Sequence, residues 1–114
     1  MRYTVSINQN RDFRRLYSSG KSAVNAYLAI YCRRNKTAVN RLGLTVGTKI
    51  GKAVVRNRVR RRIREAYRLR EASLKTGYDI VIVARTRTAH CSYQEIDRAL
   101  AALLGKLGIC EEQA

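Results

Sequence analysis

The side chains that could do chemistry in this 114-residue chain are concentrated in one arginine-rich stretch. Between positions 49 and 70, ten residues are basic and only Glu65 is acidic. Like charges repel, so a polyanion is the natural partner of such a stretch. Arginine makes planar, bidentate contacts with phosphate and stacks on bases, which favours a nucleic acid over a merely soluble surface. The ten basic residues are Lys49, Lys52, Arg56, Arg58, Arg60, Arg61, Arg62, Arg64, Arg68 and Arg70.

The composition of the whole chain predicts one small, basic domain. Hydrophobic residues make up 46% of the chain, enough for a modest core, and 24 basic against 8 acidic residues give a formal charge of +16. We predict a single domain over residues 1–114, with a frayed tail from about residue 109 to 114. No stretch approaches the roughly 20 apolar residues that span a bilayer, and the first residues lack the apolar core of a signal peptide. We therefore expect no membrane partner and a cytoplasmic location.

The sequence offers no set of residues for catalysis by the protein itself. The eight carboxylates are scattered, and the single histidine, His90, cannot supply both an acid and a base. Three widely spaced cysteines, Cys32, Cys91 and Cys110, resemble neither a disulfide framework nor a zinc site. We predict no catalytic residue and no metal ligand in the protein, so any phosphoryl chemistry would take its metal ions from elsewhere.

The arginine-rich stretch fits an amphipathic helix over about residues 52–74. One side of its helical wheel is apolar and carries Val55, Val59, Ile63, Ala66 and Leu74. The opposite side carries Asn57, Arg60, Arg61, Arg64 and Arg68, with Arg56 at its border. Arg58 and Arg62 lie nearer the apolar side, over which their alkyl chains can extend. The cationic strip that results is about 18 Å long.

A shorter helix is predicted over residues 8–19, with Asn8 or Asn10 as its cap and Gly20 as its end. Phe13 and Tyr17 recur on it at helical spacing. Packing in the core is the first explanation for these two aromatic residues. Because arginines such as Arg14 surround them, a stacking surface for unpaired bases is the alternative.

The remaining segments predict strands and a last helix. Residues 26–33 alternate between an apolar face, expected to face the main core, and a face with Tyr31 that is only partly covered. Further strands are predicted at 21–24, 42–46 and 78–84. Ser92 and Glu95 form a capping box before a helix that ends at Gly108. The fold class is therefore α+β, an α-β sandwich around one sheet.

The order of several motifs closely resembles the signature of the bacterial ribonuclease P protein subunit. These motifs are residues 41–46 (RLGLTV), 49–51 (KIG), 53–58 (AVVRNR) and 61–64 (RRIR). Further matches lie at residues 12–13, 17, 20–21, 31 and 78–85. Many family members carry two adjacent lysines where this chain has Thr48 and Lys49.

The resemblance implies a non-catalytic subunit of an endoribonuclease that leaves a 5′ phosphate. One copy of the protein would bind one catalytic RNA, which holds the magnesium ions and cuts the 5′ leader from precursor tRNA. The implied element order is αβββαβα, with a left-handed β-α-β crossover around the long helix, as in the second domain of ribosomal protein S5. The general rule for such crossovers favours the opposite hand.

The resemblance also assigns two sets of residues on this chain. The catalytic RNA would be bound by Lys49, Lys52, Arg56, Asn57, Arg58, Arg60, Arg61, Arg64 and Arg68. The leader would be bound by Phe13, Arg14, Tyr17, Tyr31 and Arg85.

A ribosomal or other structural RNA-binding protein is the alternative function, because composition alone does not separate the two. A DNA-binding regulator is disfavoured, since no partner helix stands at helix-turn-helix spacing. A membrane-active cationic helix conflicts with the surrounding strands.

Overall fold

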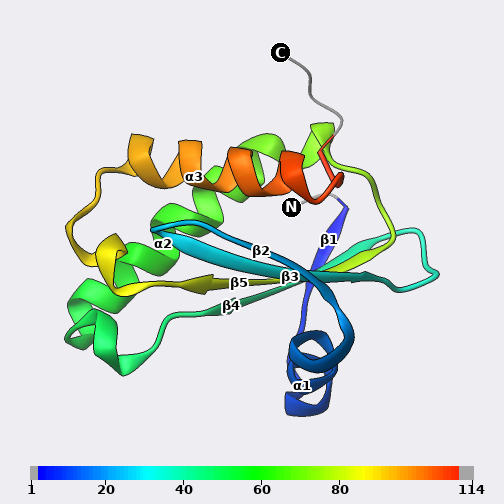
Figure 1. The fold of residues 1–114 in the computed structure, drawn as a ribbon, viewed down its shortest axis with the longest axis horizontal. Coiled ribbons are helices and arrows are strands. Elements are labelled where there is room, and N and C mark those ends of the chain that lie inside the picture. The colour runs from blue at the N-terminus through cyan, green and yellow to red at the C-terminus, as the bar shows by residue number, and fades with distance from the viewer. Residues whose placement is uncertain (1–2, 111–114) are drawn as a thin grey trace.

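One mixed sheet organises residues 3–110, the part of the chain that the computed structural model describes. The strand order in this five-stranded sheet is β1-β4-β5-β3-β2. Helices α2 and α3 cover one face and α1 lies against the other (Figure 1). The elements are β1 (Thr4–Ser6), α1 (Asn10–Ser19), β2 (Lys21–Val24), β3 (Leu28–Arg34), β4 (Asn40–Thr45), α2 (Ala53–Arg70), β5 (Tyr78–Ala84) and α3 (Tyr93–Lys106).

The sheet confirms the α+β class and corrects the predicted order of elements. Strand β1 precedes α1 and pairs in parallel with β4, so the order is βαβββαβα. The sequence did not predict β1, because three residues with one apolar side chain are too few to show an alternating pattern. The strand is held by its backbone pairing with β4 and by a 3.0 Å hydrogen bond between the hydroxyls of Thr4 and Tyr67. Strands β4 and β5 are parallel and are joined through α2. The handedness of this crossover stays a prediction.

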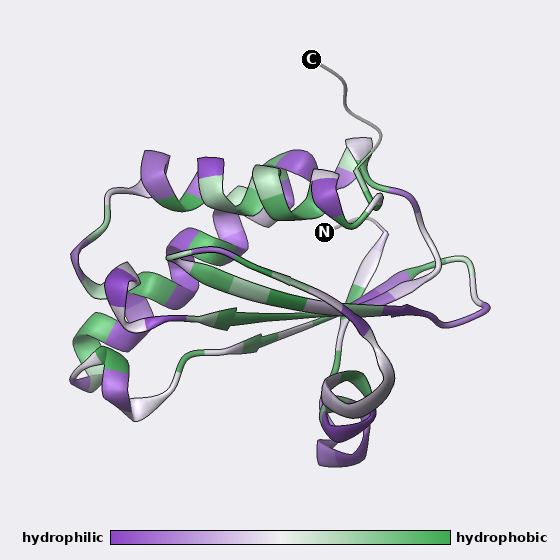
Figure 2. Cartoon of the chain, viewed as in Figure 1, coloured by the Kyte–Doolittle hydropathy of each residue, from purple (hydrophilic) through white to green (hydrophobic). Residues whose placement is uncertain are grey.

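The main core lies between the sheet and the pair α2 and α3. The apolar face predicted for residues 26–33 is confirmed, since Leu28, Ile30 and Cys32 are buried there. The strand itself begins later than predicted, because the Asn25 side chain accepts hydrogen bonds from the N–H groups of Tyr27 and Leu28 and forms a turn. Apolar residues of both helices turn inward onto the sheet (Figure 2).

A second, thinner core lies under α1. It is built from Ile7, Leu16 and Val81, with Phe13 and Tyr31 packed at its edge. Val81 belongs to the central strand β5, whose two faces are both covered, and this explains its continuous apolar sequence. α1 is therefore attached to the sheet through far less apolar surface than α2.

The helix ends differ from the predictions in two places. α1 begins after Gln9, which makes no side-chain cap, so the predicted cap by Asn8 or Asn10 is wrong. The chain up to Ile7 is held against β4 by the bond from Ile7 N to Leu42 O (2.9 Å), and this fixes where the helix can start. α2 ends at Arg70 and continues as a short 3-10 turn, so it is shorter than the predicted 52–74.

The ends of α3 agree with the sequence more closely. Both hydrogen bonds of the capping box between Ser92 and Glu95 are present. Gly108 has a φ of 77°, a left-handed conformation that suits a glycine just beyond a helix. The predicted fraying from residue 109 is wrong, because Ile109 is fully buried and its carbonyl accepts a 2.8 Å bond from Lys75 N. Residues 111–114 of that prediction lie outside the described residues.

Candidate nucleic-acid interface

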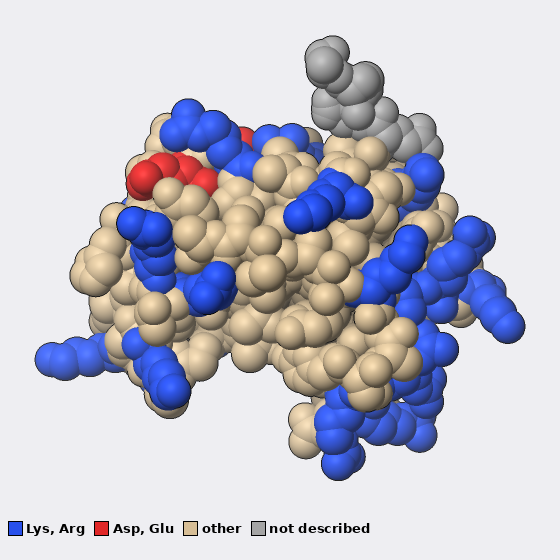
Figure 3. Space-filling model, viewed as in Figure 1, with Lys and Arg blue, Asp and Glu red and all other residues tan. Residues whose placement is uncertain are grey.

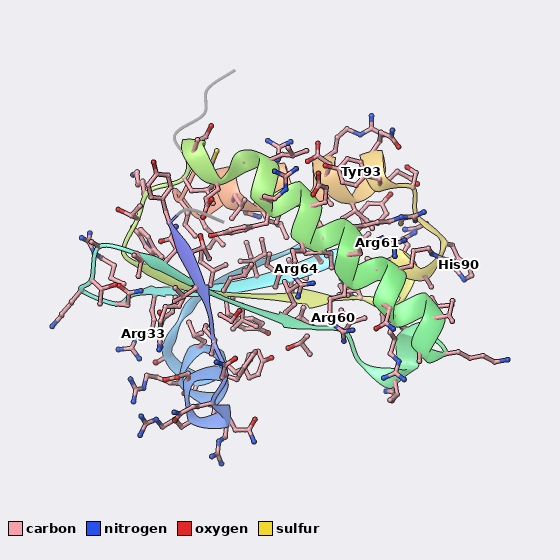
Figure 4. All side chains as sticks on the ribbon, turned by 180° about the vertical axis from the view of Figure 1, so that it is seen from behind. Arg33, Arg60, Arg61, Arg64, His90 and Tyr93 are labelled. Atoms are coloured by element: carbon pink, nitrogen blue, oxygen red, sulfur yellow. The ribbon has the colours of Figure 1, made fainter. Side chains whose placement is uncertain are left out.

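The outward face of α2 presents cations that no acidic group neutralises. Arg61 and Arg64 are exposed and have no ion pair or hydrogen bond with any other described side chain (Figure 4). Lys49 and Lys52, just before the helix, are exposed in the same way. These four side chains are free to bind phosphate, and we call them the α2 cationic surface.

Two other arginines of α2 bond to the protein itself. Arg58 donates to the carbonyl of Ala89 (3.2 Å), and Arg62 donates to the carbonyl of Cys91 (2.7 Å). Their predicted place beside the apolar side of the helix is confirmed. Both hold the segment that contains His90 against α2. A guanidinium has five N–H donors, so Arg58 keeps others for a ligand.

The other residues of the arginine strip are partly engaged with their neighbours. Arg60 donates to the side chain of Asn57 (2.9 Å). Arg68 makes a bidentate pair with Glu65 (2.9 and 2.7 Å), and this hydrogen bonding lowers the pKa of Glu65. Arg68 is therefore less available than Arg61. Arg56 differs again, because its Nε is buried and has no partner among the described residues. A buried N–H without a partner destabilises by about 1–3 kcal/mol.

The three aromatics assigned to the leader lie together between α1 and β3. The rings of Tyr17 and Tyr31 meet edge to face with 5.0 Å between centroids, and Phe13 lies 6.5 Å from Tyr17. The Tyr17 hydroxyl is 3.1 Å from Oγ1 of Thr45. Phe13 and Tyr31 pack on the thin core, whereas Tyr17 is 42% exposed. The packing interpretation is therefore confirmed for Phe13 and Tyr31, and the exposed ring of Tyr17 leaves room for a stacked base, which stays a prediction.

Two hollows meet at Phe13. The first has a volume of about 480 Å³ and is lined by Phe13, Arg14, Tyr17 and their neighbours on α1 and β4. The second has a similar volume of about 480 Å³ and is lined by β1, β4, Phe13 and the side chains of Arg60 and Arg64. We call the first the aromatic hollow. Arg85 lines neither hollow, because its side chain donates to the carbonyl of Asn25 (2.7 Å).

Sequence reasoning missed the contribution of β4 and β1 to this region. Gly43 lies directly under Phe13, and a Cβ there would be 2.6 Å from the ring. A glycine at this position leaves room for the tip of the aromatic ring against the strand. The motif at residues 41–46 contained this glycine, but only the structure shows which ring it accommodates.

An ion-pair cluster joins α1 to strands β4 and β5 of the sheet. Arg41 makes a bidentate pair with Asp79, with both distances 2.8 Å, and lies 3.5 Å from Asp12 of α1. Burial alone would raise the pKa of Asp79, but hydrogen bonds from Arg41 and Asn35 and the nearby positive charges outweigh burial and lower it. The hydrogen bond with Asp79 in turn raises the pKa of Arg41.

The described residues show two further facts. Within residues 3–110, no three His, Cys, Asp or Glu side chains lie close enough to hold a metal ion together. Over the same residues, no helix is both long and apolar enough to cross a membrane.

A single mixed sheet with a cationic helix on one face and an aromatic hollow on the other defines a small nucleic-acid-binding domain. A model of the family described as Ribonuclease P matches residues 1–108. The chain therefore belongs to the ribonuclease P protein family.

Individual relatives agree over nearly the full length. The ribonuclease P protein component of Clostridioides difficile is 43% identical over 107 residues, which are 93% of this chain and 94% of the relative. Among solved structures, the RNase P protein of Staphylococcus aureus superposes with a TM-score of 0.86 at 31% identity, over 93% of this chain and 97% of the other. The protein from Thermotoga maritima gives 0.81 at 30% identity, over 89% and 96%.

Proposed function

We propose that this chain is the protein subunit of ribonuclease P and divides its two surfaces between two RNAs. The α2 cationic surface, with Arg56, Asn57, Arg58, Arg60 and Arg68 beside it, binds the catalytic RNA. The aromatic hollow, with Tyr31, binds the single-stranded 5′ leader of precursor tRNA. The complex removes this leader and so makes the mature 5′ end.

The observation that carries the proposal is the chemical contrast between the two surfaces. The α2 cationic surface sets unpaired cations on the helix and on the turn just before it, which suits the fixed phosphates of a structured RNA. The aromatic hollow combines the rings of Phe13 and Tyr17 with the polar side chains of Asn10, Arg14 and Thr45. This suits a leader of variable sequence, because every base has a face that can stack and every nucleotide carries a phosphate.

Within this proposal the protein positions RNA and does not cut it. Hydrolysis of a phosphodiester is served by magnesium ions that stabilise the attacking and leaving oxygens, and the catalytic RNA supplies them. The protein adds affinity for the substrate and reduces the repulsion between two polyanions, so that the reaction runs at low magnesium. One protein would serve one catalytic RNA in the cytoplasm, and the cleaved product would carry a 5′ phosphate.

Reconstitution tests this proposal. The protein, the cognate catalytic RNA and a precursor tRNA are mixed at low magnesium, and cleavage is followed with each component left out in turn. We expect cleavage only when protein and catalytic RNA are both present. Cleavage by the protein alone would refute the non-catalytic role, and no stimulation of the catalytic RNA would refute the assignment as its subunit.

A further inference from the structure

A short 3-10 helix, η3 (Thr86–His90), connects β5 to α3 at the end of the sheet where β4 and β5 finish. Lysine and arginine side chains project from this end of the molecule, on the left in Figure 3. Two arginines belong to the connection itself, because Arg85 precedes η3 and Arg87 lies within it. Both are exposed, and neither forms an ion pair with a described acidic side chain. Two neighbouring cations without a counterion favour an anionic ligand.

The register of the sheet places Arg85 close to the aromatic hollow. Thr45 lines that hollow from the last position of β4, and it pairs with Val83 of β5. Neighbouring strands are about 4.8 Å apart and each residue advances a strand by about 3.3 Å, so the Cα of Arg85 lies about 8 Å from that of Thr45. A single strand of RNA that leaves the hollow toward this end of the sheet therefore meets Arg85 and Arg87 next.

Two arginines of α2 hold the far end of η3. Arg62 donates to the carbonyl of Cys91 (2.7 Å), and Arg58, one turn earlier, donates to the carbonyl of Ala89 (3.2 Å). Attachment at two carbonyls prevents the segment from pivoting about a single bond. Arg62 forms no ion pair with a described acidic side chain, so the bond to Cys91 is the one that orients its guanidinium. A hydrogen bond from a charged donor is stronger than one from a neutral donor.

Hydrogen bonds within the segment connect this attachment to the two exposed arginines. The thiol of Cys91 donates to the carbonyl of Arg87 (3.1 Å). Thr88 is fully buried, and its hydroxyl donates to the carbonyl of Arg85 (2.7 Å). The residue that Arg62 binds is therefore itself bonded to the backbone of Arg87, so a loss of the bond from Arg62 would loosen the backbone that carries the exposed cations.

The turn between β2 and β3 holds the side chains of the same two arginines. Arg85 donates to the carbonyl of Asn25 (2.7 Å), and the guanidinium carbon of Arg87 lies 5.7 Å from the centroid of the Tyr27 ring. A guanidinium has five N–H donors, so both side chains keep donors for a phosphate. The two cations are in place before a ligand arrives, and such a preformed arrangement loses less conformational freedom when it binds.

We propose that Arg62 is a positioning residue for leader binding, because it fixes η3 so that Arg85 and Arg87 bind phosphates of the leader beyond the aromatic hollow. Arg62 acts through η3 and not by contact with the RNA. Arg87 thereby joins Arg85 as a ligand of the leader. This inference rests on the proposed function, whose leader-binding surface it extends.

The test compares Arg62→Met, which keeps a long apolar side chain but loses the donor, with Arg62→Lys, which can still donate to Cys91. Lys106→Met is the control, because it removes the same charge from an exposed position of α3. Each variant is assembled with catalytic RNA, and affinity is measured for mature tRNA and for precursor tRNAs with leaders of about four and about sixteen nucleotides. The affinity of the protein for catalytic RNA alone is measured in parallel.

A double-mutant cycle separates positioning from direct contact. Arg62→Met is also made in a protein that carries Arg85→Gln and Arg87→Gln. If Arg62 acts through these two arginines, its replacement causes no further loss once they are gone, because the effects of coupled residues are not additive. Additive losses in this cycle would overturn the proposal, since Arg62 would then bind RNA itself.

We expect Arg62→Met to weaken binding of the longer leader roughly tenfold and to change the other three affinities by less than about twofold, and Arg62→Lys to restore most of the loss. Equal losses for both leaders and for catalytic RNA would overturn the proposal, because the defect would then lie in α2 as a whole. An Arg62→Met protein that matches Lys106→Met in every titration would overturn it while the proposed function stands. Wild-type protein that fails to stimulate the catalytic RNA would overturn both.

Discussion

Helices α1 and α2 both carry arginines, but they are attached to opposite faces of the sheet at very different depths. α2 buries a full stripe that includes Val59, Ile63 and Tyr67. α1 buries Leu16 as its one fully enclosed apolar side chain, together with Asp12, which pairs with Arg41. A deeply anchored helix can give its whole outer face to charge. A helix that buries little apolar surface, such as α1, leaves its aromatic rings partly exposed, and these rings can then stack on bases.

This comparison predicts that the two surfaces can be damaged separately. The largest effect should come from Arg61→Ala combined with Arg64→Ala. Each substitution removes a charged contact of about 1.5 kcal/mol, so together they should reduce the affinity for catalytic RNA roughly 100-fold. The slope of log affinity against log salt concentration should fall by about two. Titration of protein with catalytic RNA over a salt series measures both.

The matched control for this pair removes two exposed cations from α3, through Arg98→Ala with Lys106→Ala. It lowers the net charge equally, so it should cause a much smaller loss. Equal losses for the two double variants would mean that only overall charge matters, and the α2 cationic surface would not be a specific site.

Tyr17→Ala should damage the aromatic hollow. Loss of one stacked base is worth about 2 kcal/mol, so the affinity for precursor tRNA should fall by more than about tenfold, while mature tRNA and catalytic RNA are spared. Tyr17→Phe is the control, since it keeps the ring and loses only the bond to Thr45. If the alanine variant lost the same affinity for mature tRNA, the defect would lie in the thin core and not in the leader contact.

Asp79→Asn should lower the free energy of unfolding by about 1.5 kcal/mol at neutral pH, because it removes the charge that pairs with Arg41 beneath α1. The folded pKa of Asp79 is lowered, so its contribution is complete above its unfolded pKa near 4 and is lost as the pH falls through the lower folded value. Urea unfolding at a series of pH values should therefore show wild type and variant converging below about pH 4. A constant difference across that range would contradict the assigned ion pair.

The smallest effect should come from Gly43→Ala. The new methyl group would push the Phe13 ring aside, and a ring at the end of a side chain can move at little expense to stability. We expect a few-fold loss of leader-dependent affinity with an unchanged unfolding temperature and unchanged binding to catalytic RNA. Gly105→Ala, at an exposed position of α3 where an added Cβ meets nothing within 4 Å, is the control for binding.

Much of the fold followed from local patterns. The alternation along β3, the apolar stripe of α2 and the capping box of α3 were all predicted and are all present. These patterns depend on neighbours within a few residues, where the geometry of helix and strand fixes which side chains share a face. The ordered arginine motif likewise identified the family without knowledge of the fold.

Pairings between distant residues could not be predicted in this way. Strand β1 exists because it pairs with β4, and Arg62 is bonded to a carbonyl 29 residues away. Whether an arginine is free, as Arg64 is, or engaged, as Arg68 is, depends on the groups that the fold and its rotamers place beside it. A pocket of about 420 Å³ is lined by residues of α1, β3, β4, β5 and the loop between β3 and β4, and no spacing along the chain predicts it.

The sequence by itself therefore determined the charge, the family, the candidate residues for RNA binding and every α-helix and strand except β1. The tertiary structure decided which cations remain unpaired and which rings stay exposed. The physical reason is that periodicity and capping act within one or two turns of chain, whereas ion pairs and pockets form between segments that only folding brings together.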